Sequence, residues 1–276
     1  MENQTIMPTI PAQQRKGYVN YIQAFLFVGI YVTLGYVLKL DPNIYLLIGI
    51  PLTVAFQLFV RRLPIYRLWV RDSPRFKLSK LAIVIAIAFM AEPVRELVLM
   101  LIHKNTQLVK LTFLMTAMIG AIGAAFSFCS FTKATVKQFF LCLLIAGGIG
   151  IFLILLGPLA VALLKGHSMH FGFHKGIKSL LIYIPVGFVM EEVIFRGMLD
   201  TLVNPGANPK NIGSAFFVSA LWGLWHLPVA HANAVVLIVV HSLVGIPLSI
   251  FWRKSGNLAV TSFTHAFIDA VRNALM

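Results

Sequence analysis

Long apolar runs recur along the chain and are separated by short polar stretches. We distinguish nine such segments, at residues 18–38, 43–60, 81–102, 111–131, 139–164, 179–200, 212–230, 232–252 and 257–275. About 20 apolar residues suffice to cross the hydrocarbon core of a bilayer as a helix. A membrane barrel would instead alternate apolar and polar residues over about ten positions, and the sequence does not do so. The pattern predicts an all-α transmembrane bundle of about eight to nine spanning helices.

The composition supports a membrane protein. Of the residues, 59% are hydrophobic and 12% are charged, whereas soluble domains average about 25% charged residues. The formal net charge of +14 would suit a nucleic-acid-binding protein. However, membrane proteins also collect Lys and Arg in loops that face the cytoplasm and its anionic lipids. We therefore expect membrane lipid, and not nucleic acid, as a partner.

The distribution of Lys and Arg predicts the orientation. If the N-terminus is cytoplasmic and all nine segments span, fourteen of these residues lie in inside loops and six in outside loops. The stretch from Arg61 to Lys80 alone holds seven of them. The positive-inside bias predicts a cytoplasmic N-terminus in an integral protein of the plasma membrane.

Ionisable side chains within the apolar segments mark the candidate site, because each is costly in lipid and is functional by default. In the second half of the chain they are Glu191, Glu192 and Arg196 in the sixth segment, His226 in the seventh, His241 in the eighth, and His265, Asp269 and Arg272 in the ninth. Members spaced by four residues share one face of a helix. This spacing predicts that Glu192 pairs with Arg196, and that His265 and Asp269 lie side by side.

Depth in the membrane brings three of these groups to one level. Counted from the cytoplasmic helix ends, Glu191, His226 and His265 lie about 13 to 21 Å deep at ~1.5 Å per residue. We expect them to share a polar cavity near the midplane, which water reaches from the cytoplasmic side. His241 is interpreted as a packing residue outside this site.

The residue types favour activation of water over a covalent nucleophile. Two carboxylates and two histidines lie at this level, and no Ser or Cys is spaced so that it would join them there. One carboxylate can act as general base, while one histidine holds the water or moves its proton. The other histidine can donate to a developing oxyanion. The sequence therefore predicts hydrolysis of a peptide or ester within the membrane.

Three short motifs carry a resemblance to a known family. They are EEVIFR at 191–196, WGLWH at 222–226 and HAFID at 265–269. They are similar to the EExxxR, FxxxH and HxxxN motifs of the CAAX prenyl protease 2 and bacteriocin-processing family, also called CPBP or Abi. The resemblance covers roughly residues 179 to 275.

The resemblance implies an intramembrane glutamate protease. Glu191 would be the general base on water and His226 would help to orient that water. Arg196 would hold Glu192 as a structural or electrostatic partner, and His265 would lie in the oxyanion hole. The substrate would be a membrane-associated peptide or a lipidated protein, and no cofactor would be needed.

The chain departs from the family motifs at two positions. Trp222 replaces Phe, which we interpret as a change of packing; Trp222 and Trp225 are also candidate substrate-binding residues. Asp269 replaces Asn, and an ionised carboxylate would repel an oxyanion. We hypothesise that Asp269 is either protonated by burial or paired with Arg272, and that it orients His265.

Two alternatives use the same residues. Glu191, His226, His265 and Asp269 could instead be zinc ligands of a metal-dependent membrane protease, although the sequence has no HExxH motif. A catalytically inactive membrane scaffold or immunity protein of the same fold is the other alternative.

In either case we divide one integrated membrane domain into a polar cytoplasmic N-terminus (1–17), N-terminal scaffold helices (18–165) and a catalytic helical core (166–276).

Overall fold

The computed structural model describes residues 17–104, 107–165, 171–230 and 233–275. Apart from Gly17, the predicted N-terminal segment therefore lies outside the described residues. Within them every named element is a helix, and the sole β-type contact is an isolated bridge between Val70 and Asn257. The predicted all-α fold class is confirmed.

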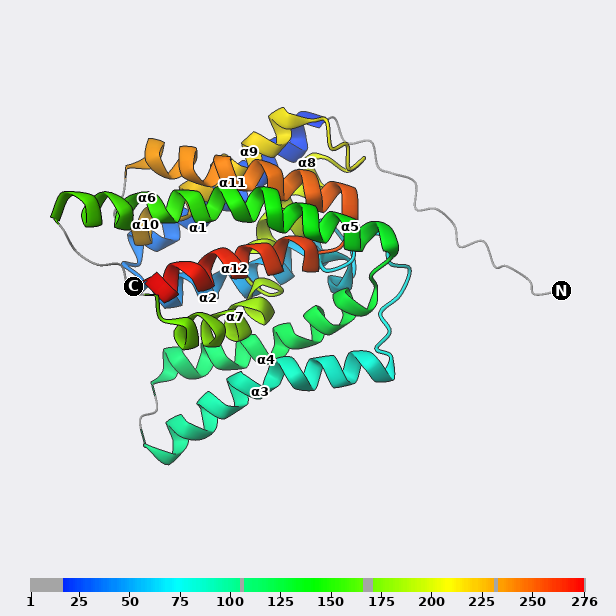
Figure 1. Ribbon diagram of the computed structural model, residues 1–276. Helices are drawn as coiled ribbons and strands as arrows, with labels where there is room; N and C mark the ends of the chain where they lie inside the picture. Colours follow the sequence, from blue (N-terminus) through cyan, green and yellow to red (C-terminus); the bar gives the residue numbers. More distant parts are fainter. Residues whose placement is uncertain (1–16, 105–106, 166–170, 231–232, 276) are drawn as a thin grey trace.

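The helices run back and forth between two ends of the molecule (Figure 1). The first half contains α1 (Gly17–Val37), α2 (Pro42–Ala55) continued by η1 (Phe56–Val60), the short η2 (Ile65–Leu68), α3 (Lys80–Ile102), α4 (Leu108–Cys129), and a long helix made of α5 (Lys133–Cys142), η3 (Leu143–Gly147) and α6 (Gly148–Lys165). The second half contains α7 (Phe173–Gly187), η4 (Val193–Asp200), α8 (Thr201–Val203), α9 (Ile212–Trp225), α10 (Leu227–Ala230), α11 (Ala234–Ser255) and α12 (Ala259–Leu275).

Five helices of the described chain are long and apolar enough to cross a membrane. They are Gly17–Val37, Pro42–Val60, Leu108–Cys129, Lys133–Leu156 and Ala234–Ser255. The expected total of eight to nine spans is not confirmed. The remaining segments are charged, broken or short: α3 carries Glu92, Arg95 and Glu96, the sixth segment is broken, and α9 and α12 have 14 and 17 residues.

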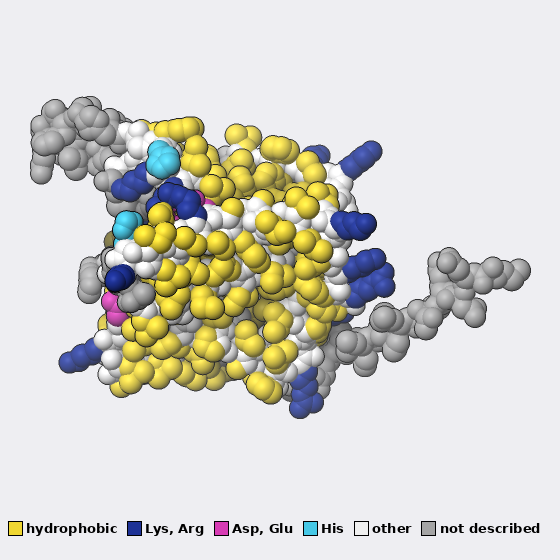
Figure 2. All heavy atoms as spheres, turned by 90° about the horizontal axis from the view of Figure 1, so that it is seen from below, with side chains coloured by type: hydrophobic (Ala, Val, Ile, Leu, Met, Phe, Trp, Pro, Cys, Tyr) yellow, Lys and Arg dark blue, Asp and Glu magenta, His cyan; other side chains and the backbone are white. Residues whose placement is uncertain are grey.

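The surface has an apolar band between two polar ends. Large apolar side chains on this band are widely exposed, among them Ile87 at 63% and Leu144 at 72%. Figure 2 shows hydrophobic side chains covering the middle of one face, with charged side chains gathered at its two ends. The long apolar helices and this apolar band indicate an integral membrane protein.

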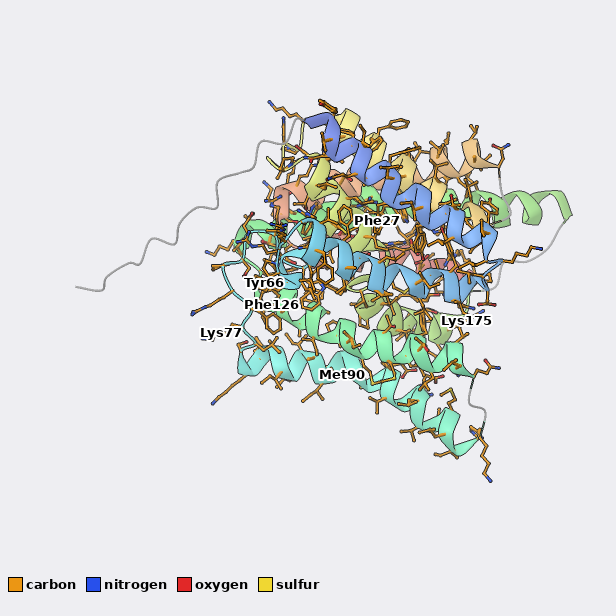
Figure 3. The ribbon with its side chains drawn as sticks, turned by 180° about the vertical axis from the view of Figure 1, so that it is seen from behind. Phe27, Tyr66, Lys77, Met90, Phe126 and Lys175 are labelled. Carbon is orange, nitrogen blue, oxygen red and sulfur yellow. The ribbon has the colours of Figure 1, made fainter. Side chains whose placement is uncertain are left out.

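The two polar ends of the bundle carry different loops. The basic face carries the N-terminus of α1, the α2–α3 loop and the loops that begin at 130, 204 and 256. The opposite face carries the α1–α2 loop, the end of α3 and the beginnings of α4 and α7. Lys77 of the basic face and Lys175 of the opposite face lie at opposite ends in Figure 3.

Close approach of helices places the site. The backbones of α9 and α11 touch at Gly223, where a Cβ would lie 2.6 Å from the carbonyl oxygen of Leu237. Small residues at such crossings let membrane helices pack closely. On the other side of α9, Trp225 is fully buried against Tyr31 and Phe195. These contacts fix the end of α9 from which His226 projects.

The sixth apolar segment is not one helix, which corrects the prediction of a continuous helix over 179–200. Helix α7 ends at Gly187, residues 188–190 are not helical, and the helix resumes at Glu191. The break exposes carbonyl groups that lipid cannot satisfy. One of them, on Phe188, accepts a hydrogen bond of 2.7 Å from Nε1 of Trp69 in the α2–α3 loop. The break therefore depends on a partner from the first half of the chain.

Candidate active site

Glu191 is the first residue of the resumed helix. Its side chain lies at the floor of the main cavity and is 21% exposed. Nε1 of Trp222 donates a hydrogen bond of 2.8 Å to Oε2 of Glu191. The start of a helix also favours a carboxylate, because its free N–H groups carry partial positive charge. Both the break and the indole thus define where the carboxylate lies.

His226 faces Glu191 from the end of α9. It lies in the capping position after Trp225, and Pro228 follows within the next short helix. Its Nδ1 is 2.9 Å from the carbonyl oxygen of Trp222, so Nδ1–H donates to that oxygen. Nε2 is thereby directed to Glu191, with 3.6 Å between Nε2 and Oε2.

His265 on α12 faces the same carboxylate from the other side. Its Nδ1 donates to Oε1 of Glu192 at 3.1 Å. Its Nε2 lies 4.0 Å from Oε2 of Glu191 and 3.5 Å from Oδ2 of Asp269. The structure therefore brings Glu191, His226 and His265 together, as their depths predicted.

Glu192 and Arg196 pair loosely beneath the site. Nε of Arg196 is 3.8 Å from Oε2 of Glu192, and both side chains are buried. The helix around them has wide π-type turns, which turn the i and i+4 side chains away from the α-helical alignment assumed from the sequence. The guanidinium also lies over the ring of Trp222, 4.9 Å from its centroid, where the electron-rich face attracts a cation.

Asp269 pairs with Arg272, as one branch of the hypothesis proposed. Nη2 of Arg272 is 2.9 Å from Oδ1 of Asp269, and Oδ2 points to His265. The carboxylate thus bridges a partly exposed guanidinium and the imidazole. Its replacement of the family's Asn is accommodated by a cation three residues away.

Trp222 is more than the packing substitution that the sequence indicated. A phenylalanine at this position could not donate to Glu191, whereas the indole does. The ring also contacts His241 and His265, with centroids 4.7 and 5.1 Å apart. Neither Trp222 nor Trp225 is among the residues that line the cavity, and Trp225 is buried on the far side of α9. The substrate-binding roles of both residues stay predictions.

His241 joins this cluster, although the motifs do not include it. Its ring lies 4.4 Å from the ring of His226, centroid to centroid, with 30° between the planes. Its Nδ1 is 2.7 Å from the carbonyl oxygen of Leu237, one turn earlier on α11. The only sequence signal for it was an ionisable residue in an otherwise apolar segment.

A cavity of about 670 Å³ leads to Glu191. Its floor includes Glu191, His265 and Asp269, and its rim includes Asp41 and Lys110. Both rim residues belong to the opposite face. The cavity rim therefore lies at the end opposite the basic loops, whereas the sequence predicted access from the end that carries them. Counting residues gives a depth, but it does not tell at which end the helices spread apart.

Among the described residues, no group of three or more His, Cys, Asp or Glu side chains has an arrangement that could hold a metal ion. The four proposed zinc ligands form carboxylate–imidazole contacts of 3.5 to 4.0 Å with one another. Zinc ligation stays a prediction that a chelator can test.

The comparisons with known proteins agree with the motifs. Residues 174–271 match the family model described as type II CAAX prenyl endopeptidase, Rce1-like. The predicted family resemblance is confirmed. The match supports a membrane protease of the CAAX type at the level of the family, and a protease acts on a peptide or protein substrate. No curated protein and no solved structure matches the chain.

Proposed function

We propose that the protein is an intramembrane endopeptidase that hydrolyses a peptide bond with water activated by Glu191. One observation carries this proposal. A single carboxylate oxygen, Oε2 of Glu191, lies at the floor of a large cavity within 4.0 Å of Nε2 of both His226 and His265. A base, a water-orienting group and an oxyanion donor are thus available around one point.

The distances suit a water molecule at the centre. Separations of 3.6 and 4.0 Å are long for direct hydrogen bonds, but they are natural for groups bridged by water. In the proposed first step, Glu191 takes one proton from this water, and Nε2 of His226 accepts a hydrogen bond from the hydrogen that stays on the oxygen. The oxygen then attacks the carbonyl carbon of the scissile bond.

The remaining groups complete the reaction. His265 takes part as the imidazolium: Nδ1–H donates to Glu192, and Nε2–H donates to the oxyanion that forms on the carbonyl oxygen. Glu191 then passes its proton to the leaving amine as the C–N bond breaks. Glu192 holds Nδ1 of His265, so that the ring keeps Nε2 directed to the cavity. The oxygen and one hydrogen of the water thus end on the new carboxyl group, and the other proton ends on the leaving amine.

Peptide cleavage by the purified protein in detergent or liposomes tests this proposal. Wild type is compared with Glu191→Gln, with and without a strong chelator, on farnesylated CAAX peptides and double-glycine leader peptides. Glu92→Gln is the matched control, because Glu92 is also a helix carboxylate and pairs with Arg95 away from the cavity floor. Only Glu191→Gln is expected to abolish cleavage, with no effect of the chelator.

Three outcomes would contradict the proposal. Activity lost to the chelator and restored by zinc would make Glu191 and the histidines metal ligands. Equal cleavage by wild type and Glu191→Gln would remove the carboxylate from the mechanism. Absence of cleavage on every peptide would favour the inactive scaffold.

A further inference from the structure

Among the described residues, the exposed polar side chains that line the cavity all belong to the opposite face. Asp41 and Asn43 at the start of α2, and Gln107 and Lys110 at the start of α4, form the described rim. Asp41, Asn43, Gln107 and Lys110 are exposed. The walls between this rim and Glu191 are apolar, with Phe113 on α4 among them. A substrate that reaches Glu191 by this route enters past the loops that carry fewer positive charges.

The described charges divide unequally between the two ends. At the basic face lie Arg61, Arg62, Arg67, Arg71, Arg75, Lys77, Lys80, Lys133, Lys137, Lys210, Arg253 and Lys254. At or near the opposite face lie Lys39, Arg95, Lys104, Lys110, Lys175, Lys178 and Arg272. Of the acidic residues, Asp41, Glu92, Glu96 and Asp269 lie toward the opposite face, whereas Asp72 and Asp200 lie toward the basic face, where Asp200 pairs with Arg253.

Ion pairs reduce the opposite-face charge further. Lys178 and Lys110 lie 2.8 and 3.5 Å from Glu96, and Arg95 contacts Glu92. By contrast, the basic stretch from Arg61 to Lys80 includes a single acidic residue, Asp72. Such a stretch stays on the cytoplasmic side, because translocation against the membrane potential is costly and anionic lipids hold it there.

We propose that the cavity opens to the non-cytoplasmic side of the membrane, and that its occupant is a polypeptide segment presented there. The orientation rests on the charge distribution and the rim. The identity of the occupant rests additionally on the proposed peptidase function. The expected substrate is an exported peptide, or the translocated and membrane-proximal segment of a membrane protein.

The lining suits such a segment. An extended peptide has apolar side chains for the walls, near Leu46, Phe113 and Met190, and polar backbone groups for the floor. The rim carries one negative side chain, Asp41, and one positive side chain, Lys110, and polar residues next to the bound segment can contact them. A C-terminus lipidated in the cytoplasm would have to cross the bilayer before it could reach this entrance.

Two variants, each with one accessible cysteine, test the orientation without reference to catalysis. Cys129 is first replaced by Ser, while Cys142, which is fully buried, is kept. Asn43→Cys then marks the rim and Pro74→Cys marks the α2–α3 loop; both positions are exposed and neither change alters the charge. Intact cells are treated with a membrane-impermeant maleimide before and after permeabilisation, and a soluble cytoplasmic thiol protein reports leakage.

The expected result is labelling of Asn43→Cys in intact cells and of Pro74→Cys after permeabilisation only. The reverse pattern would overturn the proposal, and so would labelling of both or neither in sealed cells. The same labelling in a Glu191→Gln background is expected, because accessibility does not depend on hydrolysis. A failed orientation is thereby distinguished from a failed peptidase function.

The occupant is tested in sealed vesicles of both orientations. A double-glycine leader peptide, which does not cross the bilayer, is added to right-side-out and to inverted vesicles of the wild type. Cleavage is expected in right-side-out vesicles and, after permeabilisation, in inverted ones. Cleavage of the leader peptide by sealed inverted vesicles but not by right-side-out vesicles would assign the cavity to a cytoplasmic substrate. Cleavage of a farnesylated CAAX peptide, with the leader peptide left intact, would do the same.

Discussion

Trp222 donates its indole N–H to the same oxygen of Glu191 that faces the two site histidines. The carboxylate is therefore held by a neutral donor, while the imidazoles stay at distances that leave room for water. A tryptophan at this position gives the site a contact that the family's phenylalanine could not supply.

Replacing Trp222 with Phe tests that contact. A hydrogen bond to a charged group contributes about 1.5–3 kcal/mol, so we expect kcat to fall roughly 10- to 100-fold with little change in KM. Trp252→Phe is the matched control, because Trp252 is buried and its Nε1 donates to Thr201, away from Glu191. Equal losses in the two variants would indicate a general effect of removing an indole.

Asp269→Asn separates the two possible uses of this carboxylate. If the charge bridging Arg272 and His265 is needed, the amide should lower kcat by about 10-fold, as expected for a lost charge-assisted contact. Arg272→Gln should then have a similar effect. Unchanged or higher activity of Asp269→Asn would show that the carboxylate has no obligatory part in orienting His265.

His241→Phe tests whether this ring positions His226. The phenyl ring keeps the packing but removes the hydrogen bond from Nδ1 to the Leu237 carbonyl. We expect a fall in kcat of about 10-fold, consistent with loss of one modest interaction, and an altered pH–rate profile. His241→Asn, which retains a polar group, should recover part of the activity. A change in thermal stability without a change in the profile would leave His241 as a packing residue.

The buried pair of Asp200 and Arg253 should contribute to stability and not to chemistry. Nη2 and Nε of Arg253 lie 2.6 and 2.9 Å from the two carboxylate oxygens, and both side chains are about 1% exposed. Removing one partner leaves an uncompensated buried charge, which costs about 3–5 kcal/mol. We expect Asp200→Asn to lower the melting temperature in detergent.

The double variant Asp200→Asn with Arg253→Gln provides the control for that measurement. It should be more stable than either single variant, because neither charge is then left without its partner. An additive loss would contradict the pairing. Activity measured below the melting temperature should stay close to that of the wild type.

The sequence predicted the convergence of the site better than its surroundings. Depths counted along helices brought Glu191, His226 and His265 to one level, because the break at residues 188–190 lies outside the stretch counted from the helix end to Glu191. The polar cluster was recognisable because ionisable groups are expensive in lipid. His241 carried the same signal, but its spacing linked it to no motif.

The features that the sequence did not predict, the break in the sixth segment and the cavity walls from the first half of the chain, depend on contacts between distant parts of the chain. Pro185 and Gly187 were available as signals of a helix end, yet the run stays apolar through Met190. The partner of the break, Trp69, lies 119 positions away. The predicted scaffold segment also supplies cavity walls, Leu46 and Phe113 among them. Residue counts along single helices contain no information about such contacts.

The bond between Trp69 and Phe188 also orders the assembly of the protein. Until the α2–α3 loop docks, the carbonyl of Phe188 has no indole donor, and lipid offers none. The resumed helix, and with it Glu191, can therefore reach its final position only after the first two helices have been inserted. A contact of such long range forms late in folding. A fragment limited to residues 174–271 would contain every motif residue, yet it would lack the donor that closes the break in front of them.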